Sequence, residues 1–153
     1  MSTPQAYSEG GYHLRMFVTP YAVRFADVDN AGIFYYPRFF NAFHVAFEEW
    51  WERGVKRPYH LITGKDRVGF PAVHIECDFN RPVTFGDPME IRVGVKRIGR
   101  TSVVFRYEIA HRETGEIHCA ADITKAVVDM NTWKPIVPPP AIKKALESIA
   151  IPG

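Results

Sequence analysis

One stretch of the sequence combines residue types that could attack a carbonyl group. It places two carboxylates, Asp27 and Asp29, ahead of a glycine and an aromatic run that ends at Pro37. A long apolar segment follows directly, so a carboxylate lies beside the N-terminal end of an expected helix. Free backbone N–H groups and the positive end of the helix dipole gather at such an end. A carboxylate placed there can act on a carbonyl while the donors hold the negative charge that develops on its oxygen.

The elements that position this stretch follow from hydrophobic periodicity. Residues Val18 to Ala26 alternate between apolar and polar, which is typical of a strand. The segment Pro37 to Arg53 carries six phenylalanines and tryptophans and begins with a proline, which predicts a helix too apolar to be exposed. Gly54 is the expected C-terminal stop of this helix. The following segment, Val55 to Phe70, contains proline and glycine and is expected to be irregular.

Four further segments alternate with the period of two that strands show. Their apolar stripes are Ile75, Cys77 and Phe79; Met89, Ile91, Val93 and Val95; Val103, Phe105, Tyr107 and Ile109; and Ile117, Cys119, Ala121 and Ile123. Short glycine-containing turns at Ile98–Thr101 and Arg112–Glu116 separate the last three, and a short amphipathic helix is expected at Ala141–Ile149. One apolar helix and about five antiparallel strands predict an α+β fold in which a single curved sheet wraps the helix. Such a sheet leaves edges that a dimer would cover.

Composition sets limits on the class of protein. The chain has 153 residues, of which 46% are apolar and 24% charged, which predicts one globular domain over residues 16–153 after a flexible tail at residues 1–15. A net charge of +2 is too small to argue for nucleic acid. No apolar run is long enough for a membrane helix, and the tail lacks the apolar region of a signal peptide. Cys77 and Cys119 fall on apolar strand positions, so buried, reduced thiols in a cytoplasmic protein are expected.

Three motifs, taken with their spacing, carry a family resemblance. They are Val23-Arg24-Phe25-x-Asp27-x-Asp29-x-x-Gly32-Ile33-x-Tyr35-Tyr36-Pro37, then Phe79-x-Arg81-Pro82-Val83-x-Phe85-Gly86-Asp87, and Gly99-Arg100-Thr101-Ser102. Together the motifs resemble acyl-CoA thioesterases of the 4-hydroxybenzoyl-CoA thioesterase type, over about Val18 to Val137. The resemblance implies a hotdog fold, a homodimer or a homotetramer built as a dimer of dimers, and hydrolysis of an acyl-CoA thioester without metal or cofactor.

The same resemblance implies roles for residues of the first motif. Asp29 would be the catalytic carboxylate, and the backbone N–H of Tyr36 would polarise the thioester carbonyl. Gly32 would let the backbone turn tightly or approach the thioester closely. Asp29 either attacks the carbonyl to give a mixed anhydride or activates water as a general base, and the sequence leaves both routes open. Asp27 is interpreted as structural, accepting hydrogen bonds from N–H groups of the turn. The active site would lie at a dimer interface.

Candidate substrate-binding residues fall into two groups. The first lies along the start of the helix and would shape an apolar acyl pocket: Phe34, Tyr35, Phe40 and His44. The second surrounds a strand–turn–strand segment and offers donors to the phosphates of coenzyme A: Arg97, Arg100, Thr101 and Ser102. His44 stands where the resembling 4-hydroxybenzoyl-CoA enzyme carries an acidic residue, which argues against that substrate. No metal-ligand spacing is present.

Two other functions remain as alternatives at this stage. A hotdog hydratase or dehydratase would use a positioned histidine with a carboxylate, but no histidine stands close to Asp29 in the sequence. A non-catalytic module that binds acyl-CoA or lipid would not need the carboxylate at all. The acyl group, and the choice between coenzyme A and an acyl carrier protein, stay open, with the basic turn favouring coenzyme A.

Overall fold

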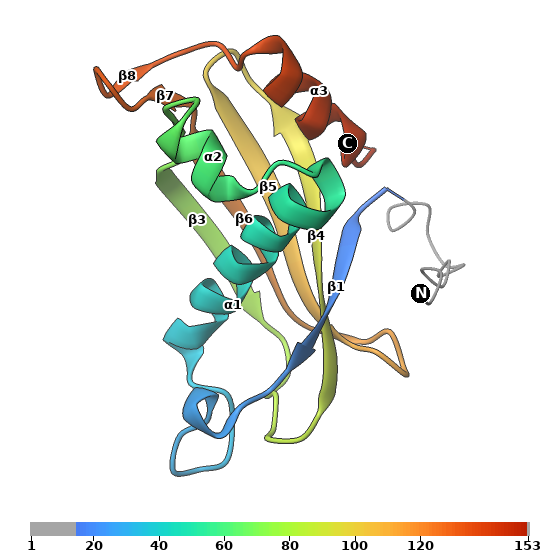
Figure 1. Ribbon diagram of the computed structural model, residues 1–153. Helices are drawn as coiled ribbons and strands as arrows, with labels where there is room; N and C mark the ends of the chain where they lie inside the picture. The colour runs from blue at the N-terminus through green and yellow to red at the C-terminus, as the bar shows by residue number, and fades with distance from the viewer. Residues whose placement is uncertain (1–14, 153) are drawn as a thin grey trace.

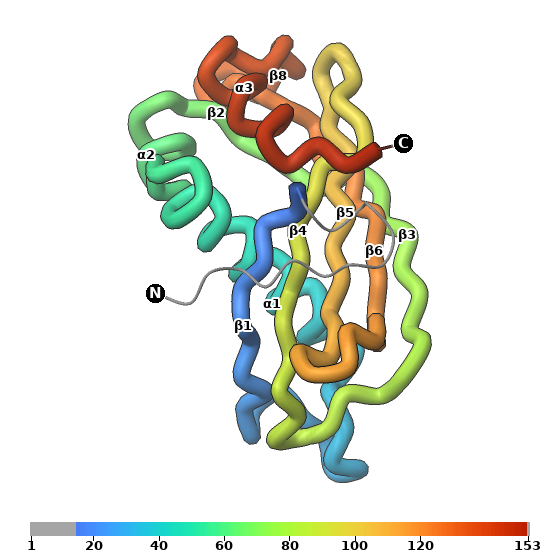
Figure 2. Tube along the Cα trace, turned by 90° about the vertical axis from the view of Figure 1, so that its right-hand side faces the viewer, coloured from blue at the N-terminus to red at the C-terminus, as the bar shows by residue number. Residues whose placement is uncertain are grey.

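One long helix, α1 (Tyr36–Glu49), lies across one face of a five-stranded antiparallel sheet in the computed structural model (Figure 1). Residues 15–152 are described, so the predicted tail lies outside them except for Arg15. The strands are β1 (Phe17–Ala22), β3 (Ala72–Phe79), β4 (Pro88–Ile98), β5 (Ser102–His111) and β6 (Ile117–Ala126). They run side by side in the order β1-β4-β5-β6-β3 (Figure 2). The predicted α+β arrangement of one helix and five strands is confirmed.

The central helix runs further than its sequence pattern predicts. It begins at Tyr36 with Pro37 in its first turn and continues beyond Glu49 as a π-helical segment, η2 (Trp50–Val55). The chain leaves the helix only at Lys56, whose φ of 63° is left-handed, so the predicted stop at Gly54 is wrong. Gly54 serves packing instead, because a Cβ there would lie 2.8 Å from the Trp50 ring.

Two segments depart from the periodicity that predicted them. The first strand ends at Ala22 instead of Ala26, and the chain passes through a 3-10 turn, η1 (Phe25–Asp27). The turn breaks the alternation, so the Phe25 side chain is 81% exposed where the strand pattern placed it inward. The segment expected to be irregular contains a short helix, α2 (Tyr59–Gly64), and a two-residue strand. Such short elements are fixed by tertiary pairing and leave no periodic signal.

A small second sheet and a C-terminal helix complete the fold. The sheet joins β2 (Val68–Gly69), β7 (Val128–Asp129) and β8 (Lys134–Pro135). The helix is α3 (Pro140–Ser148), one residue from its predicted range. These elements lie near the C-terminal end of α1, whereas the loop that precedes α1 lies at the other end of the sheet (Figure 1).

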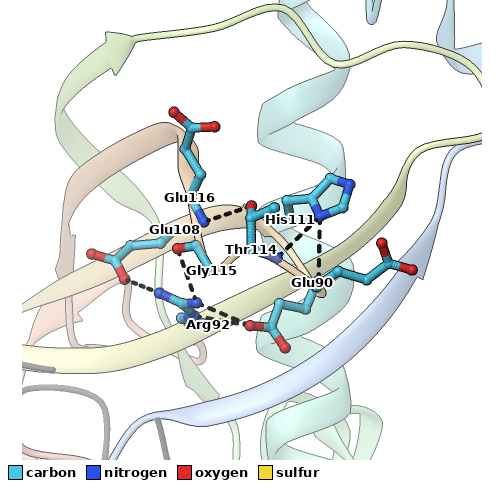
Figure 3. Close-up of polar contacts among 8 residues, drawn as sticks. Glu90, Arg92, Glu108, His111, Thr114, Gly115 and Glu116 are labelled. Carbon is cyan, nitrogen blue, oxygen red and sulfur yellow. Dashed lines mark hydrogen bonds and ion pairs between the residues drawn. The ribbon is translucent and has the colours of Figure 1, made fainter. Parts of the chain in front are cut away.

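Charged side chains occupy the outer face of the sheet, which points away from α1. The Arg92 guanidinium is 2% exposed and contacts Glu90 at 3.0 Å, Glu108 at 3.5 Å and the Gly115 carbonyl at 3.5 Å (Figure 3). Further ion pairs join Glu108 to Arg106, Arg106 to Asp122, and Asp122 to Lys96. This series of contacts, from Glu90 to Lys96, is called the outer ion-pair chain, and it links side chains of β4, β5 and β6.

The edge strand β3 leaves apolar side chains exposed. Its residues Ile75 and Phe79 pair with Ile123 and Cys119 of β6, which belong to the buried inner face. Ile75 is nevertheless 45% exposed and Phe79 51% exposed, because β3 is the last strand of the sheet. A long edge strand with exposed apolar side chains is a surface suited to pairing.

A lysine interrupts the apolar inner face of β6. Lys125 is 5% exposed, and its Nζ lies 3.5 Å from the centroid of the Phe47 ring, with the Phe105 and Tyr107 rings at 5.4 and 5.8 Å. Burial lowers the pKa of Lys125 to about 7, and the nearby Glu48 carboxylate opposes this shift. The aromatic faces stabilise the ammonium form, but only in part.

Lys125→Met should stabilise the protein most at neutral pH and below. Between about pH 7 and pH 10 the unfolded chain holds a proton on this amine that the folded chain has lost, so the free energy of unfolding rises with pH. Methionine removes the cost of the buried amine, and we expect a gain of about 1–4 kcal/mol at pH 7 that shrinks toward pH 10. Thermal unfolding across this range measures it, with Lys143→Met on the exposed face of α3 as the control. A loss of stability at pH 7 would contradict the prediction.

Candidate active site

The loop before α1 folds back on itself and fixes the position of Asp29. Val28 and Phe34 form a β-bridge, and within it the Asp29 N–H donates to the Ile33 carbonyl at 2.9 Å. The Gly32 N–H donates to the Asp29 carbonyl at 2.9 Å. Gly32 has a φ of +79°, a left-handed conformation that favours glycine, which explains why the turn needs it. The loop thus holds Asp29 beside Ile33, which lies three residues before the first residue of α1.

The Asp29 carboxylate is exposed and only partly engaged. Its Oδ1 accepts a hydrogen bond from the Ala31 N–H at 2.8 Å, which is the geometry of an aspartate that closes its own turn. Within residues 15–152 its other oxygen, Oδ2, makes no hydrogen bond. One oxygen therefore orients the carboxylate while the other can face a ligand.

The backbone N–H of Tyr36 is a free donor at the start of α1. The Phe34 N–H donates to the Val83 carbonyl at 2.7 Å, the Tyr35 N–H to the Asp27 carbonyl at 2.8 Å, and the Arg38 N–H to the Tyr35 carbonyl at 2.9 Å. Pro37 has no N–H, and no side chain caps the helix. From Phe34 to Arg38, Tyr36 has the one backbone N–H without a hydrogen bond to a described residue, and this N–H lies at the positive end of the helix dipole.

Asp27 links the loop that carries Asp29 to the end of β1 and the first turn of α1. Its carboxylate is buried and accepts hydrogen bonds from the Tyr21 hydroxyl at 3.0 Å and the Arg24 N–H at 2.9 Å. The Arg38 guanidinium lies 3.4 Å away as an ion pair. Burial, together with the Asp27 carboxylate, raises the pKa of Tyr21 to about 12, so the hydroxyl stays a donor. The predicted structural role of Asp27 is confirmed.

The aromatic residues proposed for an acyl pocket have different environments. Phe34 is buried against Tyr21 and Phe39 and belongs to the core. The Tyr35 and Tyr36 rings are exposed and pack on each other. Phe40 is half-buried at the side of α1. These placements leave their proposed contacts with substrate as predictions.

His44 lies on the exposed side of α1, about two turns beyond Tyr36. Its ring packs near the rings of Phe47 and Tyr59, and its Nε2 lies 3.6 Å from a Glu48 carboxylate oxygen. Burial lowers the pKa of His44, and the Lys125 charge adds to this effect. The histidine is therefore mostly neutral near pH 7.

Phe79 was predicted as part of a strand stripe and of the second motif but not as a site residue, yet its ring adjoins the site. Its ring centroid lies 5.5 Å from that of Phe39 and 6.4 Å from that of Tyr36. The exposed end of β3 thus reaches the start of α1. A sequence signal was available, because Phe79 opens the second motif, but the pairing of β3 with the sheet decides where it lies.

The basic residues proposed to bind coenzyme A phosphates lie at the far end of the sheet. The turn between β4 and β5 is closed by the Gly99 N–H donating to the Ser102 carbonyl at 2.8 Å, and it lies near α3 (Figure 1). The start of β4, by contrast, pairs with the end of β1, close to the Asp29 loop. One chain therefore does not bring Arg97, Arg100, Thr101 and Ser102 together with Asp29, and their role stays a prediction.

Sequence reasoning missed Lys125, although its position carries a signal. Lys125 is the next residue in phase after the apolar stripe of Ile117, Cys119, Ala121 and Ile123. A lysine in phase with an apolar stripe is unusual, because such a position is expected to be buried. In residues 15–152 no group of three potential metal ligands occurs, and no helix there is long and apolar enough to cross a membrane.

Comparison with known proteins gives consistent matches. The family profile of the thioesterase-like superfamily matches residues 23–146. A 1,4-dihydroxy-2-naphthoyl-CoA hydrolase of Nostoc punctiforme is 35% identical over 106 residues, covering 69% of this chain and 68% of that protein. A hydrolase of the same name from Prochlorococcus marinus is 27% identical over 135 residues, covering 84% of this chain and 88% of that protein. The crystal structure of a thioesterase superfamily protein from Jannaschia has a TM-score of 0.82 at 26% identity, covering 93% of this chain and 97% of that one.

The matched region contains the Asp29 loop, the central helix and all of the strands from β3 to β8. The fold, the motif and the family profile therefore agree, and the chain belongs to the thioesterase-like superfamily, with the hotdog fold.

Proposed function

We propose that this protein hydrolyses an acyl-CoA thioester to a carboxylic acid and free coenzyme A, with Asp29 as the catalytic carboxylate. The observation that carries the proposal is the unpaired Tyr36 N–H at the start of α1, beside a loop that presents Asp29 with one free oxygen. A thioester carbonyl whose oxygen accepts from that N–H would have its negative charge stabilised as it develops. The named relatives are CoA thioester hydrolases, which supports the same reaction here.

Asp29 can serve this reaction in two ways. As a nucleophile, its free oxygen adds to the carbonyl carbon, the C–S bond breaks, and coenzyme A leaves as a thiolate. Water then cleaves the resulting mixed anhydride and restores the carboxylate. As a general base, it takes a proton from water while that water attacks, and the proton passes to the departing thiolate. Water is the only co-reactant in either route, so we expect neither metal nor cofactor to take part.

Asp29→Asn should lower kcat by about 10²-fold or more, because an amide is a poor nucleophile and a poor base. Release of free thiol from a panel of acyl-CoAs measures the rate. Asp129→Asn is a matched control, since Asp129 closes a turn in the same way, accepting from the Asn131 N–H at 2.8 Å. Equal loss in both variants would mean that the turns matter only for folding. Wild-type rates in Asp29→Asn would exclude Asp29 as the catalytic group and favour a binding module.

The role of the Tyr36 N–H can be separated from that of its ring. Tyr36→Pro removes the N–H at the first helical position, where proline fits, whereas Tyr36→Ala removes the ring and keeps the N–H. We expect the proline variant to lose about 10²–10³-fold in kcat relative to the alanine variant. The measurement is steady-state hydrolysis, with circular dichroism to establish that both variants keep their helices. Similar rates in the two variants would show that the N–H does not stabilise the oxyanion.

The minimal active unit in this proposal is a homodimer that forms through β3, and two dimers could assemble into a tetramer. The exposed side chains of Ile75 and Phe79 support this pairing, since a second copy would bury them and satisfy the strand edge. The free thiols of Cys77 and Cys119 suit a reducing compartment, so we place the protein in the cytoplasm.

Ile75→Glu should shift the protein toward a monomer, because it places a charge in the proposed interface. Light scattering after size exclusion gives the mass. Val137→Glu, a change at a side chain that is 55% exposed elsewhere, is the control and should leave the mass unchanged. A dimer or tetramer that persists in Ile75→Glu with wild-type stability would mean that another surface holds the copies together.

A further inference from the structure

In the part of the chain that the structure describes, Lys125 and Tyr107 lack the polar partners that buried polar groups usually have. No ion pair among residues 15–152 includes Lys125, although Glu48 lies close enough to affect its pKa. The hydroxyl of Tyr107, whose ring also borders Lys125, is buried and makes no hydrogen bond. Within these residues the amine contacts aromatic rings but has no ion pair, and the hydroxyl has no hydrogen bond, so burying both is costly and a ligand with an anionic oxygen would supply the missing partner.

Within one chain these groups are too far from Asp29 to share an acyl group with it. Lys125 lies over Phe47, which is eleven residues along α1 from Tyr36. At about 1.5 Å of rise per residue, that is roughly 16 Å. The sheet gives the same result, because Lys125 pairs with Ala72 at one end of β3 and Cys119 pairs with Phe79 at the other.

Pairing of two copies through β3 changes this geometry. When an edge strand pairs antiparallel with its own symmetry copy, the start of one strand lies beside the end of the other. The Ala72 end of one β3 would then adjoin the Phe79 end of its partner. Phe79 packs beside Tyr36, and Lys125 lies beside Ala72, both on the inner face. The two-fold axis keeps the inner faces of both sheets on the same side. Lys125 of one subunit would therefore lie near the Phe79 and Tyr36 end of the other subunit.

We propose that Lys125 of the partner subunit binds a negatively charged oxygen at the far end of the acyl group that Asp29 attacks. The preferred substrates would be acyl-CoAs with an aromatic or aliphatic body and a second anionic oxygen, either a carboxylate or an ionised hydroxyl. The aromatic rings of Phe47, Phe105 and Tyr107 would contact the apolar body, and the Tyr107 hydroxyl would add a donor. This inference rests on the proposed hydrolysis and names its substrate class.

The charges near the site are consistent with an anionic ligand. Burial lowers the pKa of Lys125 to about 7, and an adjacent anion would favour the ammonium again. His44, whose pKa is lowered, adds no fixed charge, whereas Glu48 at the exposed side of α1 would oppose an anion that extended past the lysine. The amine therefore sets both the charge and the length of the acyl group.

Selectivity is the first test. The measured quantity is the ratio of kcat/KM for terephthaloyl-CoA, which carries a second carboxylate, to that for 4-methylbenzoyl-CoA, which is similar in shape and uncharged. A third substrate, 4-hydroxybenzoyl-CoA at pH 7 and 9, separates a carboxylate from an ionised hydroxyl. We expect Lys125→Met to lower the ratio by about 10- to 100-fold, and Lys125→Arg to keep part of it. Lys143→Met should keep the wild-type ratio.

A proportional loss on all substrates would make Lys125 structural and overturn the proposal, as would an unchanged ratio. Failure of the proposed hydrolysis is a different result, since the wild type would then release thiol from no acyl-CoA.

Mixed dimers test whether the lysine acts across the interface. Asp29→Asn and Lys125→Met chains would be co-expressed with different affinity tags, and the heterodimer isolated through both tags. If Lys125 serves the partner's Asp29, one of the two sites has both groups intact, and terephthaloyl-CoA hydrolysis returns to about half of the wild-type rate. If each lysine serves its own chain, neither site is intact, and the rate stays at or below half that of the Lys125→Met homodimer. The second result would overturn the cross-subunit assignment.

Discussion

The buried carboxylate of Asp27 is the constraint on which the active-site geometry depends. A charge removed from water must be matched by donors, and here these come from the end of β1, the turn after it and the first turn of α1. The strand and the helix therefore cannot move apart without leaving that charge unpaired. The Asp27 carbonyl also accepts from the N–H of Tyr35, the residue before α1. Asp27 thus fixes where the helix begins, and the N–H of its first residue, Tyr36, has no acceptor within the helix.

The sequence specified the parts of the fold whose periodicity is long and regular. Strands of ten or eleven residues, such as β4 and β5, alternate through several complete periods, so their inward faces could be predicted. Predictions failed where a local turn overrides the alternation, as at Phe25, or where packing decides between two roles of glycine, as at Gly54. The short strands β2 and β8 have two residues each and no pattern to detect. Their existence depends on contacts between segments far apart in the sequence.

The candidate site divides in the same way. Asp29, Gly32 and Tyr36 stand within eight residues of one another, so a local motif could identify them. Lys125 lies about a hundred residues after Asp29 in the sequence, and it comes near α1 only because β6 is one of the strands on which α1 packs. Within one chain the residues of the β4–β5 turn lie at the opposite end of the sheet from Asp29, which no local motif indicates. In the dimer that we propose, sequence proximity identifies the reacting groups, while the groups that select the acyl chain depend on assembly.

The outer ion-pair chain has a consequence for how the sheet finds its alignment. Side chains alternate strictly between the two faces, so sliding β4 by one residue against β5 would turn Arg92 toward the aromatic rings and move Ile91 to the charged outer face. It would also separate the guanidinium from both carboxylates that now hold it. A misaligned sheet would therefore lose apolar packing on its inner face and ion pairs on its outer face. The outer ion pairs would in this way select the native register during folding, because they disfavour shifted pairings that an evenly apolar sheet would tolerate.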